Sequence, residues 1–187
     1  MARIPPLPET DACPAARRLL DEQRAAHGRV TNMKRTLAHS PTALAALMRW
    51  YDLHAEVVAF LGPRPTTIFV QAVSSQTNCL ICSTFFRRWL IDAGENPDRL
   101  ALDEREQALA DFGRQLARDA NQVSDDLFAL LAKFFRPAEI VTLTAFGGLM
   151  IATNVFNNAL RVDLDEYLVA YRGESAMTND EGRMTKE

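Results

Sequence analysis

Apolar residues recur at helical spacing along most of this chain, and no stretch shows the sustained alternation of apolar and polar residues that a half-buried strand requires. The pattern therefore predicts an all-α protein. Capping residues and prolines at helix starts, and glycines at helix ends, mark the boundaries. The expected helices cover residues 10 or 11–27, 30–38, 41–60, 65 up to the following helix, 79–93, 103–120, 124–135, 137–160 and 165–172.

The order of these helices predicts a single helical domain over residues 1–173, followed by a polar tail over residues 174–187. The chain has 187 residues, of which 48% are hydrophobic and 24% charged, as in an ordinary soluble domain. Its net charge of -3 offers no basic surplus for nucleic acid. The longest apolar run, near residues 142–152, is too short to span a bilayer, and the N-terminus lacks a signal-peptide core, so we expect a cytoplasmic protein without a membrane partner.

Two of the three cysteines form a Cys-x-x-Cys pair, Cys79 and Cys82. Asn78, directly before them, is a good helix N-cap, so both sulfurs are expected in the first turn of a helix and on one of its faces. Unpaired backbone N–H groups there favour a thiolate. One sulfur of such a dithiol attacks an oxidant and the other closes a disulfide, so the pair indicates redox chemistry.

The segment opening with Pro65 and the motif Val-Ser-x-x-x-Asn-Cys-x-x-Cys resemble the helical hairpin of the carboxymuconolactone decarboxylase / alkylhydroperoxidase D superfamily, in its peroxidase-related branch. The leader over residues 28–41 and the segment over residues 154–160 are also similar to that family. The resemblance implies an AhpD-like helical bundle and a thiol-dependent reductase of hydroperoxides or disulfides. It further implies that Cys82 attacks the oxidant and Cys79 resolves it, with no cofactor. A lactone decarboxylase is a weaker alternative, because those members lack the cysteine pair.

Two positions depart from the peroxidase pattern. The family's glutamate and histidine relay positions fall on Thr67 and Phe86, and neither side chain accepts a proton at neutral pH. A relay of this type contributes about 10²–10⁴-fold to the rate. Glu56 and His54 are candidate replacement bases, and Thr67 is a candidate polar contact; the spacing selects none of them.

Two other interpretations stay open beside the redox enzyme. Phe69, Phe85, Phe86 and Trp89 could form an apolar pocket in a non-catalytic, ligand-binding scaffold, although aromatic residues at helical spacing usually pack in a core. A zinc site requires four ligands, and the chain offers no second pair at metal-binding spacing, so no metal is expected.

Three asparagines, Asn154, Asn157 and Asn158, stand on an otherwise apolar helix. Such residues are expected to bond buried carbonyl groups or to cross a subunit interface. The apolar helices exceed what one small bundle needs, so the expected partners are copies of the same chain and a small-molecule oxidant or disulfide. The resemblance implies a trimer or hexamer, with a dimer as the alternative.

Overall fold

The computed structural model describes residues 1–173. This part of the chain is helical and contains no strand, which confirms the all-α prediction. The predicted polar tail lies outside the described residues. The elements are η1 Glu9–Asp11, α1 Pro14–His27, α2 Asn32–Leu37, α3 Pro41–Met48, α4 Trp50–Leu61, α5 Pro63–Gln76, α6 Leu80–Asp92, α7 Glu104–Asp119, η2 Ala120–Gln122, α8 Asp125–Phe134, α9 Pro137–Leu160 and η3 Glu166–Tyr171.

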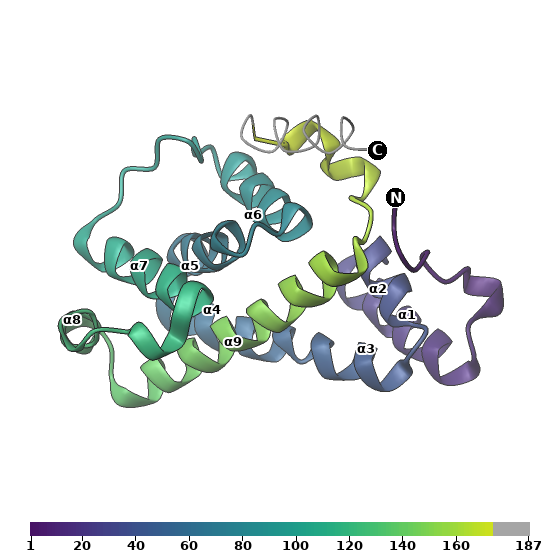
Figure 1. Cartoon of the computed structure of the whole chain (residues 1–187), viewed down its shortest axis with the longest axis horizontal. Coiled ribbons are helices and arrows are strands. Elements are labelled where there is room, and N and C mark those ends of the chain that lie inside the picture. Colours follow the sequence, from purple (N-terminus) through teal and green to yellow (C-terminus); the bar gives the residue numbers. More distant parts are fainter. Residues whose placement is uncertain (174–187) are drawn as a thin grey trace.

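Helix α5 lies at the centre of the fold and packs against α4, α6, α7 and α9. The long helix α9 crosses the molecule beside α4, while α1, α2 and α3 gather at one end (Figure 1). Beyond α9, the chain returns so that η3 packs on α6. Segments from the beginning, middle and end of the sequence therefore meet around α6.

Local capping sets several helix starts where the sequence predicted them. Ser40 and Ser124 accept hydrogen bonds from the backbone N–H groups of Ala43 and Leu127. Helix α7 begins with a capping box formed by Asp103 and Glu106. Helix α1, by contrast, begins at Pro14 because residues 9–11 form a separate 3₁₀ turn, and the last predicted helix is the 3₁₀ segment η3.

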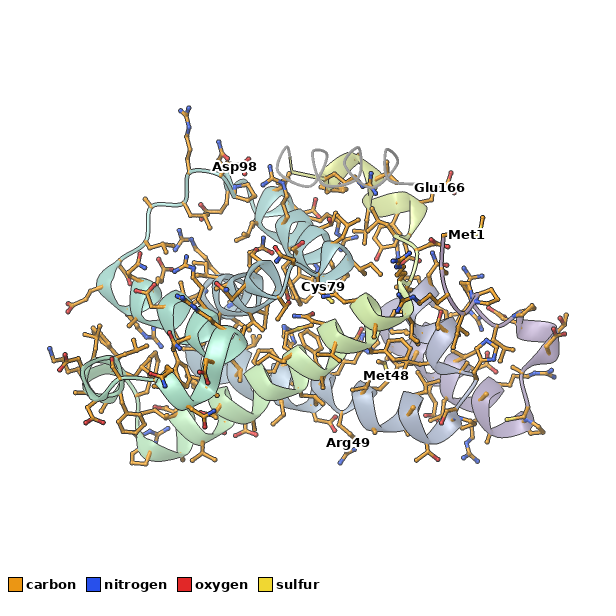
Figure 2. The ribbon with its side chains drawn as sticks, viewed as in Figure 1. Met1, Met48, Arg49, Cys79, Asp98 and Glu166 are labelled. Atoms are coloured by element: carbon orange, nitrogen blue, oxygen red, sulfur yellow. The ribbon has the colours of Figure 1, made fainter. Side chains whose placement is uncertain are left out.

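The predicted helix over residues 41–60 is broken at Arg49, which separates α3 from α4. The Arg49 N–H bonds the carbonyls of Ala46 and Leu47 in a tight turn, and its side chain points away from the other helices (Figure 2). Trp50, directly after the break, is buried in the core. The break lets α3 pack on α1 and α2 while α4 packs on α9, and no proline or glycine in the sequence announces it.

By length and composition, one helix in the described part, α9, is apolar enough to cross a membrane. In this fold it packs against α3, α4, α5, α7 and α8 and buries Leu143, Phe146 and Met150. That position in the core accounts for its apolar sequence.

The Phe69 ring lies between two glycines of neighbouring helices, Gly113 on α7 and Gly147 on α9. Phe69 is fully buried and stacks with Phe112 and Phe146, with ring centroids 6.2 and 6.1 Å away. A glycine inside a helix costs about 1 kcal/mol relative to alanine. Here it allows α5 to approach both helices closely.

We expect Gly113→Ala to lower the free energy of unfolding by about 1–3 kcal/mol, because overpacking outweighs the gain in helix propensity. A Cβ at Gly113 would lie 2.9 Å from the Phe69 carbonyl oxygen and 3.2 Å from Val73 Cγ2. Gly148→Ala is the matched control, since its Cβ would meet nothing within 4 Å. Urea unfolding measures the stability of both variants. Equal unfolding midpoints for Gly113→Ala and Gly148→Ala would contradict the close packing at Gly113.

Candidate functional site

The turn between α5 and α6 differs from the sequence prediction at Asn78. Asn78 has φ +51°, the left-handed conformation that asparagine tolerates better than most residues, and it ends α5 instead of capping α6. The Cys79 N–H then bonds the Ser74 carbonyl at 3.1 Å and closes the α5 terminus. The N-cap of α6 is Cys79 itself, and Cys82 lies in the first helical turn.

The two sulfurs differ in their access to the surroundings. Both cysteines have free thiols; Cys79 is 0% exposed and Cys82 is 6% exposed. Cys82 lines a pocket, whereas Cys79 does not. Cys79 lies inside the molecule where α6 begins (Figure 2). A small molecule in the pocket therefore meets the Cys82 sulfur first.

Asn157 on α9 is the amide that contacts both sulfurs. Its Nδ2 lies 3.3 Å from Cys82 Sγ, 3.9 Å from Cys79 Sγ and 3.5 Å from Met33 Sδ. The sequence alone did not link Asn157 to the cysteines. The signal was an asparagine on an apolar helix face, and only the packing of α9 showed its partners.

The neighbouring asparagines of α9 hold the turn that carries the cysteines. Asn154 Nδ2 donates to Thr77 Oγ1 at 2.8 Å, and Asn158 Nδ2 donates to the Thr77 carbonyl at 2.9 Å. These bonds satisfy polar groups of the α5–α6 turn; only the Asn158 bond reaches a carbonyl, and that bond is exposed, not buried as predicted.

Hydrogen bonding within the cysteine pair separates the two thiol pKa values. The Cys82 thiol donates to the Cys79 sulfur, and this bond, with the backbone N–H groups of Cys82 and Ile81, lowers the pKa of Cys79 despite its burial. The same bond and burial raise the pKa of Cys82 well above its usual value. The predicted helix-terminus stabilisation therefore acts on Cys79, and the singly ionised pair keeps its remaining proton on Cys82.

The pocket beside Cys82 has a volume of about 70 Å³. At 10–15 Å³ for each water, it has room for about five waters or one small molecule. Helix α6 contributes Ile81, Cys82, Phe85 and Phe86, and the remaining lining comes from α2, α3, α4, α9 and the η3 region. The lining is mainly apolar, as is usual for small-molecule sites.

Two of the four aromatic residues considered for a pocket line the pocket beside Cys82. Phe85 and Phe86 line it, but Phe69 lies in the core between α7 and α9, and Trp89 packs on Phe85 and Phe86 outside the lining. In their place, α4 supplies Trp50. Phe69 belongs to α5, which contributes no residue to the lining, and Trp89 lies one turn beyond Phe85 and Phe86 on α6.

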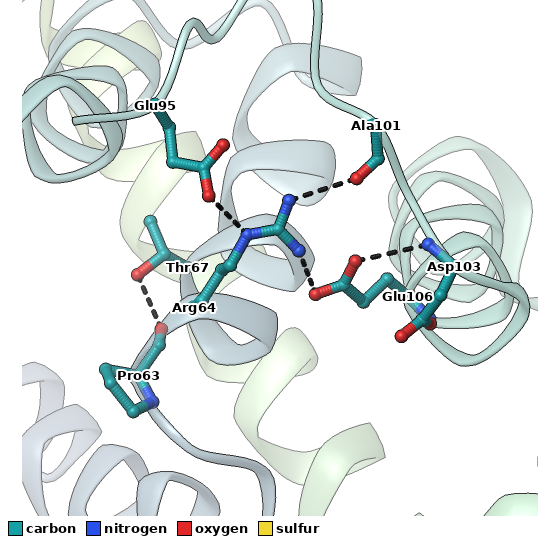
Figure 3. Close-up of polar contacts among 7 residues, drawn as sticks. All are labelled: Pro63, Arg64, Thr67, Glu95, Ala101, Asp103 and Glu106. Atoms are coloured by element: carbon teal, nitrogen blue, oxygen red, sulfur yellow. Dashed lines mark hydrogen bonds and ion pairs between the residues drawn. The ribbon is translucent and has the colours of Figure 1, made fainter. Parts of the chain in front are cut away.

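The three polar candidates from the sequence do not contact the sulfurs. Glu56 is exposed and accepts a hydrogen bond from Thr142 at 2.9 Å. Thr67 donates to the Pro63 carbonyl of its own helix at 2.9 Å (Figure 3). The His54 ring stacks on Trp50 at 4.8 Å, and burial together with the nearby His27 lowers its pKa. None of the three lines the pocket, so the structure gives no support to them as bases for Cys82.

No protein-family model and no curated protein matches this chain. Solved structures do match it. The debrominase Bmp8 is 17% identical with a TM-score of 0.73, over 90% of this chain and 95% of that one. An uncharacterized peroxidase-related protein from Ralstonia eutropha JMP134, described as an alkylhydroperoxidase AhpD core, is 19% identical with a TM-score of 0.70, over 89% and 94% of the chains.

Two further solved structures are similar to this chain over a comparable share of its length. An uncharacterized peroxidase-related protein from Silicibacter sp. TM1040 is 18% identical with a TM-score of 0.68, over 89% of this chain and 94% of that one. A cysteine-to-alanine variant of Bmp8, in complex with 2,3,4-tribromopyrrole, is 17% identical with a TM-score of 0.71, over 90% and 94%.

The chain has the AhpD-like fold.

Within this AhpD-like fold, the positions that departed from the family pattern have local explanations. The Thr67 hydroxyl bonds its own helix, and Phe86 is a buried pocket-lining ring 6.0 Å from Trp50. Neither position supplies an acid or a base. Of the groups hydrogen-bonded to the Cys82 thiol, Asn157 does not titrate and Cys79 does.

Proposed function

We propose that this protein is a thiol-dependent reductase of a small molecule, in which Cys82 attacks the substrate and Cys79 resolves the product as a disulfide. The observation that carries the proposal is the position of Cys82 on an apolar pocket with a hydrogen-bonded, more acidic Cys79 behind it. The pocket volume of about 70 Å³ favours a small molecule over a protein disulfide.

In this proposal the Cys79 thiolate replaces the missing glutamate and histidine as the base. It takes the Cys82 proton as the Cys82 sulfur attacks. Asn157 donates its amide hydrogen towards the sulfurs, which favours negative charge on them. A base held next to a nucleophile in this way is the usual arrangement in nucleophilic catalysis.

With a hydroperoxide, the Cys82 sulfur attacks the terminal oxygen and the O–O bond breaks. Cys82 becomes a sulfenic acid, and the leaving alkoxide takes the proton from Cys79. The Cys79 thiolate then attacks the Cys82 sulfur, an S–S bond forms, and the departing hydroxide takes up from the solvent the equivalent of the proton that Cys79 released on ionisation. One peroxide is thus reduced to an alcohol and water, and two cysteines are oxidised to a disulfide that an external thiol reductant reopens.

Reductive dehalogenation of an aryl halide is the second candidate, favoured by the apolar lining and by the structural similarity to a debrominase. The Cys82 sulfur would take the halogen as the carbon–halogen bond breaks, and the aryl carbanion would take the proton from Cys79. Attack of Cys79 on the Cys82 sulfur would then release halide and form the same disulfide.

Thiol titration tests the proposal. One equivalent of cumene hydroperoxide is expected to remove two of the three thiols and to lower the intact mass by two hydrogen atoms. A brominated pyrrole in a parallel sample tests the second candidate through released bromide. If both cysteines stay reduced with both compounds, the non-catalytic scaffold is the better description.

We also propose a homo-oligomer, supported by apolar side chains that remain exposed on α8 and α9, including Phe128, Val141 and Val155. Light scattering that returned only the monomer mass would contradict it.

A further inference from the structure

The pocket beside Cys82 also contains two charged side chains that the proposed thiol chemistry does not use. Lys34 from α2 is 2% exposed, and Asp165, just before η3, is 8% exposed. Lysine is almost never this buried without a partner. Both residues line the same pocket as Cys82, which gives an otherwise apolar site a charged region.

Lys34 has no carboxylate within 4 Å among residues 1–173. Its ammonium lies 5.0 Å from the centroid of the Tyr51 ring, a cation–π contact. Burial lowers the pKa of Lys34 to about 8, while the charge of Asp165 opposes that change. At neutral pH most of the protein therefore carries a buried positive charge at the pocket wall.

The surroundings of Asp165 are also positive. Arg29 and Arg35 act on its carboxylate together with Lys34, and neither arginine has an ion pair within 4 Å in the described part of the chain. One carboxylate oxygen of Asp165 accepts the Asn32 N–H at 2.9 Å; the other is buried without a donor among the described residues. Three cations and one carboxylate leave this region positive in a chain whose net charge is -3.

We propose that the pocket selects a single-ring aromatic compound with one anionic oxygen group, an aryl carboxylate or a phenolate, whose anion pairs with Lys34. The ring would lie against Trp50 and Phe86, and the charge would compensate the buried ammonium. Tyr51 and Tyr167 complete the polar wall. The inference rests on the proposed function for the identity of the site, and it names the substrate class for that site.

Binding is measured by calorimetry and by quenching of tryptophan fluorescence, with benzoate and 4-nitrophenolate as anions and benzamide as the neutral analogue. Both anions are expected to bind more tightly than benzamide. Lys34→Met keeps the aliphatic volume and is expected to weaken anion binding about 10- to 100-fold, with little change for benzamide. Lys133→Met, which removes an exposed lysine from α8, is the matched control and should change nothing.

The pH dependence gives a second readout. Benzoate stays ionised near neutral pH, so its affinity should fall as the pH rises through about 8 and Lys34 loses its proton. Tyr51, with its pKa raised by burial to about 12, stays neutral across this range. Burial and the charge of Lys34 lower the pKa of His27, so His27 is also neutral there. Lys34→Met should abolish this fall.

The binding test does not depend on thiol chemistry, because benzoate, 4-nitrophenolate and benzamide are neither hydroperoxides nor aryl halides and no cysteine has to react. Preference for one anion over the other separates carboxylate from phenolate. Equal affinity for benzoate and benzamide, binding unaffected by Lys34→Met, or no binding of either anion would each overturn the inference. The thiol titration reports independently on the proposed function.

Discussion

Cys82→Ser is expected to leave the remaining thiols reduced after hydroperoxide treatment. A serine hydroxyl does not give up electrons to the oxidant as a cysteine sulfur does, and Cys79 behind it is 0% exposed and does not line the pocket. Intact mass and thiol counts should both stay unchanged. This is the largest effect on activity that the structure predicts, because the substitution removes the sulfur that meets the pocket.

Cys79→Ser should behave differently. Cys82 keeps its place on the pocket but loses both the thiolate that accepts its proton and the partner for a disulfide. The attack is expected to slow by about 10²–10⁴-fold, the usual contribution of a general base. The product should be a sulfenic acid, which dimedone labels, instead of a disulfide.

The pH profile separates these roles. In the parent protein, hydroperoxide should remove the thiols rapidly even at a pH below the ordinary pKa of a thiol, because hydrogen bonds lower the pKa of Cys79. In Cys79→Ser the profile should move to higher pH, since burial raises the pKa of Cys82.

Cys13→Ser is the control: Cys13 is exposed at the start of α1, so its loss should leave the reaction intact. Disulfide formation in Cys82→Ser protein would contradict the assignment of the attacking sulfur.

Arg64→Met is expected to lower the free energy of unfolding by about 3 kcal/mol, the lower end of the range for breaking a buried ion pair, because Glu106 is buried whereas Arg64 is 33% exposed. Arg64 bonds the carboxylate of Glu106, the carboxylate of Glu95 at 2.5 Å and the Ala101 carbonyl at 3.0 Å (Figure 3). The Glu106 side chain is 8% exposed and also accepts the Asp103 N–H in the capping box of α7. Removing Arg64 would leave this buried carboxylate without its cation.

The chain provides a matched control for Arg64. Arg136 also precedes a proline at the start of a helix and pairs with Glu139 at 2.8 Å, but its side chain is 81% exposed. Arg136→Met should therefore cost no more than about 1 kcal/mol.

Urea unfolding of both variants checks the difference. Adding Glu106→Gln to Arg64→Met should recover part of the loss, because the unpaired charge is then removed. Equal stability of Arg64→Met and Arg136→Met would show that the buried cluster does not hold α5 to α7.

The sequence located the cysteine pair at a helix start but misassigned the cap. Asparagine favours both the N-cap and the left-handed position at a helix end, so Asn78 alone could not distinguish the two. Asn78 takes the helix-end conformation because α5 continues to Gln76. The turn at Thr77 that follows is held by Asn154 and Asn158 of α9. This difference affects the chemistry of the site, because Cys79 is the N-cap of α6 and the more acidic of the two thiols.

The pocket likewise combines residues that the sequence identified with residues that only the fold brought together. Phe85 and Phe86 were found because they follow Cys82 on the same helix, whereas Lys34 and Asp165 come from opposite ends of the sequence. No local pattern relates such residues. Their meeting required the break at Arg49 and the return of the chain over α6.

By itself the sequence determined the helical class, most helix boundaries and the placement of two sulfurs at one helix start. These depend on hydrogen bonds and side-chain preferences within a few residues. Only the tertiary structure decided which sulfur meets the pocket, which amide contacts it and which charges line it. Burial and hydrogen bonding between distant segments set those properties, and no interaction within a single helix specifies them.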